Sequence, residues 1–324
     1  MRLNAIIRCH LVFATLVFAI STTATTSHAA QTSRIYHVGN SLSNQTGNEY
    51  LQALGAQRGI DVTYGNHIAA GNGLGYMIAN PESATGWSPT TYSTALPNNA
   101  WDVVTLQTYG DTYDTNKNAI KQMMNLTRQN AANQATKFYI FEDWPQDLEH
   151  AGPGSTPVDY SQHWLSIYDA NNPSDGVNRL KTWSRGYSDQ LMSDLRGAAF
   201  NSPVEIKRIR TGEVFYQLDQ LAEAGQLGTT TEIEQWYADP YHMGDFGAYA
   251  SQLTMFAAVY GQNPAGLPAP AGMTPDVAAK VQQTVWNVVT NDPYSGVTVP
   301  EPSAFALLGI SAVALLRRRS RRAA

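Results

Sequence analysis

Five short runs of β-prone residues alternate with longer stretches of helical periodicity in this chain, and this alternation limits the possible folds. The clearest candidate for a buried strand is residues 101–107, and the other runs are residues 33–38, 61–64, 137–141 and 204–209. Helical patterns cover residues 49–58, 116–133, 177–199, 214–224, 246–260 and 275–289. Strands separated by such helices indicate βαβ crossovers. We therefore expect an α/β fold, a three-layer α/β/α sandwich with a mainly parallel sheet of about five strands.

Two stretches interrupt this alternation. Residues 80–99 are rich in Pro, Ser, Thr and Asn, and residues 144–172 mix Pro and Gly with Trp and Tyr. Both are predicted to be loops or lids that follow strands. No internal repeat is evident, so we expect one domain over residues 30–296.

The N-terminus has the pattern of a secretory signal. Arg2 and Arg8 precede an apolar run of about ten residues, which is too short to cross a bilayer, where roughly 20 residues are needed. Small residues at Ser27 and Ala29 match the positions that a signal peptidase recognises. We predict a signal peptide over residues 1–29 that signal peptidase cuts after Ala29.

The C-terminus, residues 297–324, forms a linker and a tail of a different kind. The segment 299–302 reads Val-Pro-Glu-Pro, an apolar stretch follows over 304–316, and five arginines lie between 317 and 322. Such a stretch with a basic flank predicts a transmembrane helix that anchors the chain transiently in the inner membrane. The order of these features resembles the PEP-CTERM sorting signal of Gram-negative bacteria that produce exopolysaccharide. That resemblance implies cleavage by an exosortase and a final location in the periplasm, on the outer surface or in the extracellular matrix.

Charge and cysteine content exclude several classes of function. The signal contains two basic residues and the tail five, with Glu301 as the one acid of both segments. The body between them therefore has 14 basic and 25 acidic residues, a formal charge of −11, which makes nucleic acid an unsuitable partner. The single cysteine, Cys9, lies inside the signal, so the mature chain has no thiol for catalysis, disulfides or metal binding.

Two groups of residues suggest nucleophilic catalysis. Ser41 follows the first strand directly, at the strand end where parallel sheets place their active sites. By itself this serine is more typical of a helix N-cap than of a nucleophile. Asp239 and His242 lie three residues apart ahead of the helix at 246–260, a spacing at which an imidazole base has a carboxylate partner. This pair alone is also a common and weak signal.

Taken together, the sequence Gly39-Asn40-Ser41-Leu42 and the later Asp239-x-x-His242, followed by Gly247 and Tyr249, resemble the SGNH (GDSL-like) hydrolase superfamily. The resemblance covers roughly residues 34–260. It implies a flavodoxin-like α/β/α fold in which Ser41 attacks an ester carbonyl, His242 takes its proton and Asp239 orients His242. The reaction that this resemblance implies needs no cofactor.

The same resemblance implies an oxyanion hole made by the backbone N–H of Ser41, the N–H of Gly71 and an asparagine side chain after the third strand. This chain departs from the pattern at the third position, where Gln107 stands at the strand end. We expect the Gln107 amide to be the substitute donor, with Tyr109 as the other candidate. Trp144 and Tyr109 are the predicted substrate-contacting rings.

The remaining histidines give no metal site. His37 is expected to pack beside the sheet, and no histidine pair has the spacing with carboxylates that zinc sites require. The leading hypothesis is an exported serine esterase that removes O-acyl groups, in particular O-acetyl groups, from surface or matrix polysaccharide. Two alternatives remain open at this point: a catalytically silent carbohydrate-binding or matrix protein on the same fold, and a lipase-like or thioesterase-like hydrolase.

Overall fold

The computed structural model of the protein describes residues 31–85, 90–146, 159–166, 183–198, 200–202 and 204–298. The predicted signal peptide and nearly all of the predicted sorting tail lie outside these residues. Within them, no helix has the length and apolar character that a membrane span requires.

Five parallel strands form the central sheet, in the order β2-β1-β3-β4-β5. Their bounds are β1 Gln31–Gly39, β2 Ile60–Ile68, β3 Val103–Gln107, β4 Lys137–Glu142 and β5 Ile206–Arg210. Every residue of β3 is buried, as expected for the middle of a sheet that is covered on both faces. The strand order reverses between β1 and β3, the kind of position where such sheets bind ligands.

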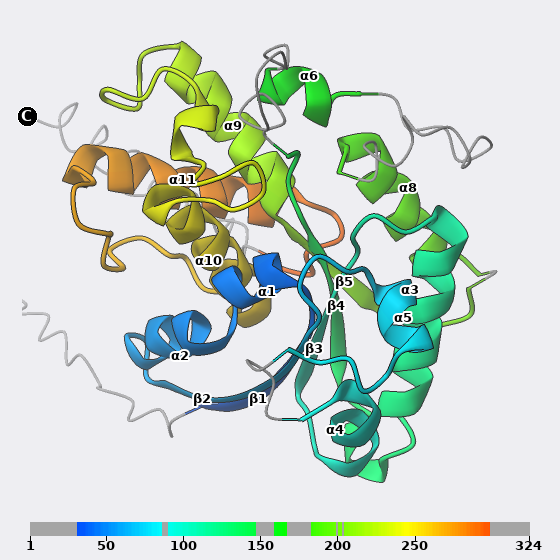
Figure 1. Ribbon diagram of the computed structural model, residues 1–324. Helices are drawn as coiled ribbons and strands as arrows, with labels where there is room; N and C mark the ends of the chain where they lie inside the picture. Colours follow the sequence, from blue (N-terminus) through cyan, green and yellow to red (C-terminus); the bar gives the residue numbers. More distant parts are fainter. Residues whose placement is uncertain are drawn as a thin grey trace, which may run out of the picture.

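Helices cover both faces of the sheet (Figure 1). In the part of the chain that the structure describes, the α-helices are α1 Ser41–Thr46, α2 Asn48–Ala56, α3 Leu74–Ala79, α4 Tyr92–Asn98, α5 Tyr113–Thr127, α6 Tyr160–Trp164, α8 Arg185–Arg196, α9 Thr211–Glu223, α10 Asp245–Tyr260 and α11 Pro275–Asn291. The same residues also form the short 3₁₀ helices η1 Ala131–Asn133 and η3 Ile233–Trp236. The predicted three-layer α/β/α sandwich with a five-stranded parallel sheet is confirmed.

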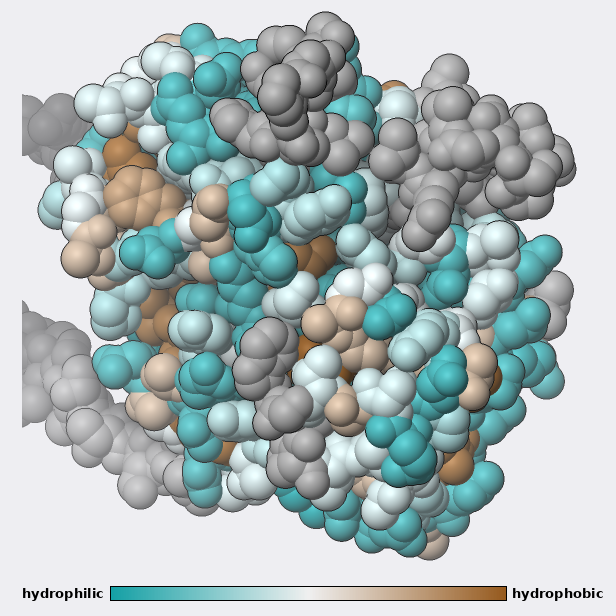
Figure 2. All heavy atoms as spheres, in the orientation of Figure 1, coloured by the Kyte–Doolittle hydropathy of each residue, from teal (hydrophilic) through white to brown (hydrophobic). Residues whose placement is uncertain are grey.

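Two hydrophobic cores separate the layers, because neighbouring strand residues point to opposite faces. Ile35 belongs to the core that contains the buried side chains of α2, α9, α10 and α11. Tyr36, the next residue, belongs to the core of α4, α5 and α8. Most apolar side chains are thus buried in these two cores. The face of the molecule in Figure 2 is largely hydrophilic, with small and separate hydrophobic areas.

Several boundaries differ from those predicted. The chain turns into α1 directly after β1, before the helix expected at 49–58, and β2 extends four residues beyond the predicted strand end at residue 64. The expected loop at 80–99 contains α4, although Pro97 lies inside this helix. Tyr92, Ala95 and Leu96 of α4 are buried in the same hydrophobic core as Tyr36 of the sheet. This packing outweighs the poor helical propensity of the segment. Likewise α6 lies within the expected loop at 144–172, much of which is outside the described residues.

Candidate active site

Ser41 lies at the carboxyl end of β1 as the first residue of α1. The preceding residue, Asn40, caps this helix, and its Oδ1 accepts from the Leu42 N–H at 3.0 Å. The N–H groups of a first helical turn have no acceptor inside their own helix. The turn therefore presents both the hydroxyl and the N–H of Ser41 at the edge of the sheet where the strands end.

The three residues expected to form the triad lie together. The His242 Nε2 atom is 2.8 Å from Ser41 Oγ, and His242 Nδ1 is 2.8 Å from Asp239 Oδ2. With its proton on Nδ1, facing the carboxylate, the imidazole has a free lone pair on Nε2 for the serine hydroxyl. This arrangement allows His242 to take the Ser41 proton as the hydroxyl attacks an electrophile.

Asp239 is built to stay ionised in spite of partial burial. Burial acts to raise the pKa of its carboxyl group, but the backbone N–H groups of His242 and Tyr241 and the His242 ring together hold this pKa below its ordinary value. The backbone donors lie 2.7 Å and 2.8 Å from Asp239 Oδ1. A carboxylate fixed by its own turn can orient His242 and stabilise the imidazolium that forms during proton transfer.

Hydrogen bonds from other elements fix the loop that contains Asp239 and His242. Gln45, one turn after Ser41 in α1, pairs with both backbone groups of Met243: its Oε1 accepts from the N–H at 3.2 Å, and its Nε2 donates to the carbonyl. The Trp144 Nε1 donates to the Tyr241 carbonyl at 3.1 Å. These contacts link the loop directly to the helix of the serine and to the end of β4.

A cavity of about 500 Å³ opens beside the serine. Its walls are formed by Asn40, Ser41, Leu42, Ala70, Gly71, Tyr109, Trp144, Gln146, Tyr241 and His242. Apart from the histidine, none of these side chains is ionisable near neutral pH. The cavity therefore suits an uncharged group of moderate size.

Of the predicted oxyanion donors Gly71 and Gln107, only Gly71 lines the cavity. Gly71 lines the cavity in the left-handed backbone region (φ 70°), in a loop that follows β2. The Gln107 side chain is 1% exposed and is not part of the cavity wall; its Nε2 donates to Asn40 Oδ1 at 2.8 Å. Its placement thus differs from the expected direct contact with substrate, because the Gln107 amide is used inside the turn that contains Ser41.

The two predicted substrate-contacting rings both lie in the cavity wall. Tyr109 is half-buried there, and its hydroxyl accepts from Gln146 Nε2 at 3.0 Å. Trp144 is only 1% exposed and packs edge-on against Phe215, with ring centres 5.4 Å apart. The ring that extends most freely into solvent is Tyr241, which is 42% exposed. Tyr241 was not predicted as a substrate contact, although its position between Asp239 and His242 in the sequence pointed to this site.

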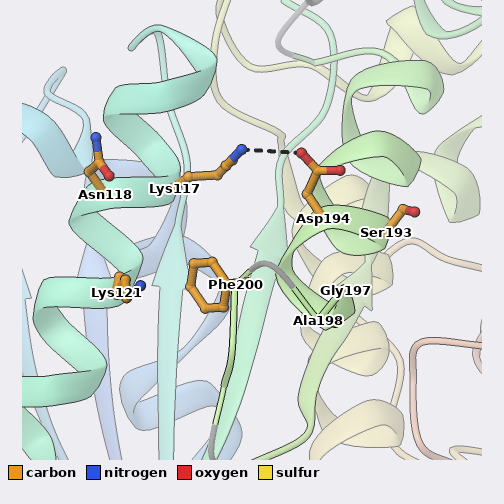
Figure 3. Close-up of a pocket in the computed structure, with 8 residues that line it drawn as sticks. All are labelled: Lys117, Asn118, Lys121, Ser193, Asp194, Gly197, Ala198 and Phe200. Atoms are coloured by element: carbon orange, nitrogen blue, oxygen red, sulfur yellow. Dashed lines mark hydrogen bonds and ion pairs between the residues drawn. The ribbon is translucent and has the colours of Figure 1, made fainter.

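A second hollow lies between α5 and α8 and has different chemistry (Figure 3). Lys117 reaches across it to Asp194, with Nζ 3.2 Å from the carboxylate. The Lys121 ammonium lies 5.6 Å from the centre of the Phe200 ring. Lys117 and Asp194 thus compensate each other's charge, and the described residues that line this hollow include no histidine that could activate Ser193.

Three carboxylates, Asp159, Asp219 and Glu223, are the group within the described residues whose spacing could accommodate a cation. Both Asp219 oxygens already accept hydrogen bonds, from Ser161 Oγ at 2.8 Å and from the Ile233 N–H at 3.1 Å. None of the three lines the cavity beside Ser41. That the protein needs no metal or cofactor stays a prediction.

Comparison with known proteins adds a sorting signal and a likeness of fold. The chain carries a PEP-CTERM protein-sorting motif. The match covers residues 298–322 and agrees with the tail predicted from the sequence. This signal implies export, a Gram-negative cell envelope and processing by an exosortase.

The solved structures that are similar to the chain include two proteins from other bacteria. A DUF4886 family protein from Bacteroides uniformis ATCC 8492 has 20% sequence identity and a TM-score of 0.56, with 80% of this chain and 95% of that chain covered. A protein from Slackia heliotrinireducens proposed to be an SGNH hydrolase has 18% identity and a TM-score of 0.41, with 70% and 98% covered. At 20% identity, the first likeness concerns the fold alone. No curated protein matches the chain.

Proposed function

We propose that the protein is an exported serine hydrolase that cleaves carboxylic esters through Ser41, His242 and Asp239. The observation that carries this proposal is the continuous set of contacts from Asp239 Oδ2 through the His242 ring to Ser41 Oγ, each 2.8 Å long. A serine hydroxyl is a weak nucleophile by itself and needs such a base. Such contacts in a surface turn would leave no room to bind a substrate. Here Ser41 lines a cavity that can hold one.

The reaction has two steps in which atoms and charges balance. In the first, Ser41 Oγ bonds to the acyl carbon while its proton passes to His242 Nε2, and the bond from the acyl carbon to the alcohol oxygen breaks as that oxygen receives the proton. In the second, His242 takes a proton from water, the resulting hydroxide attacks the acyl-serine, and the acid leaves as Ser41 regains its proton. No oxidant, reductant or cofactor enters either step.

Neutral O-acyl sugars are the substrate class that we propose, in particular O-acetyl groups on surface or matrix polysaccharide. Among the described residues of the cavity wall, none besides His242 has a side chain that ionises near neutral pH, which supports an uncharged substrate. The half-exposed ring of Tyr241 beside His242 supports a sugar, because aromatic faces and edges pack well against amphipathic rings. A sorting signal for the cell envelope is consistent with a polysaccharide target there.

Hydrolysis of p-nitrophenyl acetate by the purified body of the protein tests this function. Ser41→Ala should lower kcat by at least about a thousandfold, since removing the nucleophile of a triad leaves little activity. Ser193→Ala, a serine of the hollow between α5 and α8, is the matched control and should keep the wild-type rate. A fluorophosphonate should modify Ser41, and peptide mapping would identify the residue.

The outcomes separate this proposal from the other readings of the fold. Equal rates for wild type and Ser41→Ala, with no labelled serine, would defeat the hydrolase. Glycan binding that survives Ser41→Ala in that case would favour a catalytically silent carbohydrate-binding protein. Activity that grows with acyl-chain length would instead favour a lipase-like or thioesterase-like enzyme.

A further inference from the structure

Asn40 combines deep burial with a place in the cavity wall. The side chain is 1% exposed, yet it borders the same cavity as Ser41, Gly71 and His242. Its role as the cap of α1 uses only the oxygen of its amide, which accepts from the Leu42 N–H. The nitrogen of the same amide takes no part in this cap.

The orientation of this amide is fixed by a second hydrogen bond. Gln107 Nε2 donates to Asn40 Oδ1 at 2.8 Å, so that oxygen has two donors and cannot exchange places with the nitrogen without losing both. The Asn40 Nδ2 is directed toward the loop after β2, where its acceptor among the described residues is the Asn72 carbonyl at 3.5 Å. This distance is at the outer limit of a hydrogen bond, so the nitrogen keeps most of its capacity to donate.

Gln107 is in turn fixed by the turn that it supports. Its Oε1 accepts from the N–H groups of Asn40 and Ser43, each at 3.1 Å, and from the Ser43 hydroxyl at 2.6 Å. A Cβ atom at Gly39 would overlap both the Gln107 amide and the Ser43 hydroxyl, so only glycine leaves room for this arrangement. The side chains of Gln107 and Asn40 thus form one buried unit, and of these two residues only Asn40 lines the cavity.

We infer that Asn40 Nδ2 is a donor of the oxyanion hole, together with the N–H groups of Ser41 and Gly71. Gln107 is then a positioning residue that aims the Asn40 amide without touching substrate. This inference rests on the proposed function, because it needs a tetrahedral intermediate at Ser41. When Ser41 Oγ bonds to the acyl carbon, the electron pair of the C=O double bond moves onto its oxygen, and the Asn40 N–H stabilises that charge while keeping its proton.

Substitutions of Asn40 separate a donor from a mere helix cap. Asn40→Ser keeps an oxygen that can accept from the Leu42 N–H but removes the amide nitrogen, whereas Asn40→Ala removes both. A donor role predicts that each variant loses kcat on p-nitrophenyl acetate by about 10²- to 10³-fold, with KM within about threefold. A cap alone predicts that Asn40→Ser stays active and that Asn40→Ala loses thermal stability and activity together.

Two further variants complete the test. Asn44→Ser, on the same helix but outside the cavity wall, is the matched control and should keep the wild-type kcat. If Asn40→Ser does not fold, Asn40→Asp retains an acceptor for both Leu42 and Gln107 while removing the donor, and its kcat decides the question in the same way. A kcat within threefold of wild type in a folded Asn40→Ser or Asn40→Asp protein would overturn the inference. An inactive wild type that no fluorophosphonate labels would instead overturn the proposed function.

Discussion

Gln45 pairs with both backbone polar groups of Met243, a residue 198 positions later in the chain, and so fastens the loop of His242 to the helix of Ser41. The two residues that must exchange a proton are thereby connected through side-chain and backbone contacts in addition to their own hydrogen bond. The Gln45 carbonyl also accepts from Gln252 Nε2 at 3.0 Å, which ties α1 to α10.

Gln45→Ala should therefore lower activity by misplacing His242. We expect kcat to fall by about tenfold to a hundredfold, the loss that a displacement of about 1 Å at a reacting group produces. The two unpaired groups of Met243 should also cost about 1–3 kcal/mol of stability. Gln52→Ala is the matched control: Gln52 donates to the Val62 carbonyl at 2.7 Å, away from the cavity, so its loss should leave kcat unchanged. Equal kcat for the two variants would refute the fastening role.

Asp239→Asn tests the orienting carboxylate. The asparagine oxygen can still accept from the backbone N–H groups of Tyr241 and His242, so the turn should persist while the charge is lost. In a buried triad this change costs about 10⁴-fold in kcat. Because the Asp239 side chain is 47% exposed, we expect a smaller loss, of about 10²-fold or more. Stopped-flow or steady-state kinetics would measure it, with Asp245→Asn as control; a loss below threefold would contradict the assigned role.

The parts of this structure that the sequence predicted are those encoded in local pattern. Alternating strands and helices gave the sheet, and the spacing of Asp239 and His242 suggested a base with its orienting acid. The hydrogen bonds of Gln45 and Asn40 could not be predicted from the sequence, because their partners, Met243 and Gln107, come close only after folding. A polar side chain in a short helix carries no signal of such a partner. The same limit applies to Gln107, whose position at a strand end suggested a substrate contact but whose amide is taken by Asn40.

His37 should make the free energy of unfolding depend on pH. Burial lowers the pKa of this histidine from 6.5 to about 4, and its Nδ1 lies 2.8 Å from Thr105 Oγ1. Between pH 6.5 and 4 the unfolded chain binds a proton at this site that the folded protein does not, so stability falls as the pH falls. The loss should reach about 3 kcal/mol near pH 4.

His37→Asn should remove this contribution, because asparagine does not titrate. The variant will lose stability at every pH through the smaller side chain, but that loss should be constant. Urea unfolding at several pH values would therefore give curves of stability against pH that converge as the pH is lowered from 7 to 4. Parallel curves would show that His37 becomes protonated equally in both states.

Trp144→Phe separates support of the catalytic loop from contact with substrate. The change keeps an aromatic ring against Phe215 but removes the N–H that bonds the Tyr241 carbonyl. We expect a stability loss of about 1 kcal/mol and a kcat several-fold lower for every ester. Trp101→Phe removes an equivalent bond, from Nε1 to the Ala95 carbonyl at 3.0 Å, and should cost similar stability with unchanged kcat. If the two variants have the same kcat, the Trp144 hydrogen bond does not support catalysis.

Tyr241 offers the sharpest test of the sugar substrate. The residue is 42% exposed at the cavity, whereas its backbone N–H and carbonyl make the contacts to Asp239 and Trp144, so alanine should leave the loop in place. Tyr241→Ala should raise KM for an O-acetylated neutral oligosaccharide by about twofold to tenfold, the value of one ring contact. KM for p-nitrophenyl acetate, which has no sugar, should change by less than twofold. Tyr50→Ala is the matched control for both substrates, because Tyr50 lies on α2 and is 40% exposed. An equal rise in KM for both esters would mean that Tyr241 shapes the catalytic loop, and no rise for either would remove it from the substrate site.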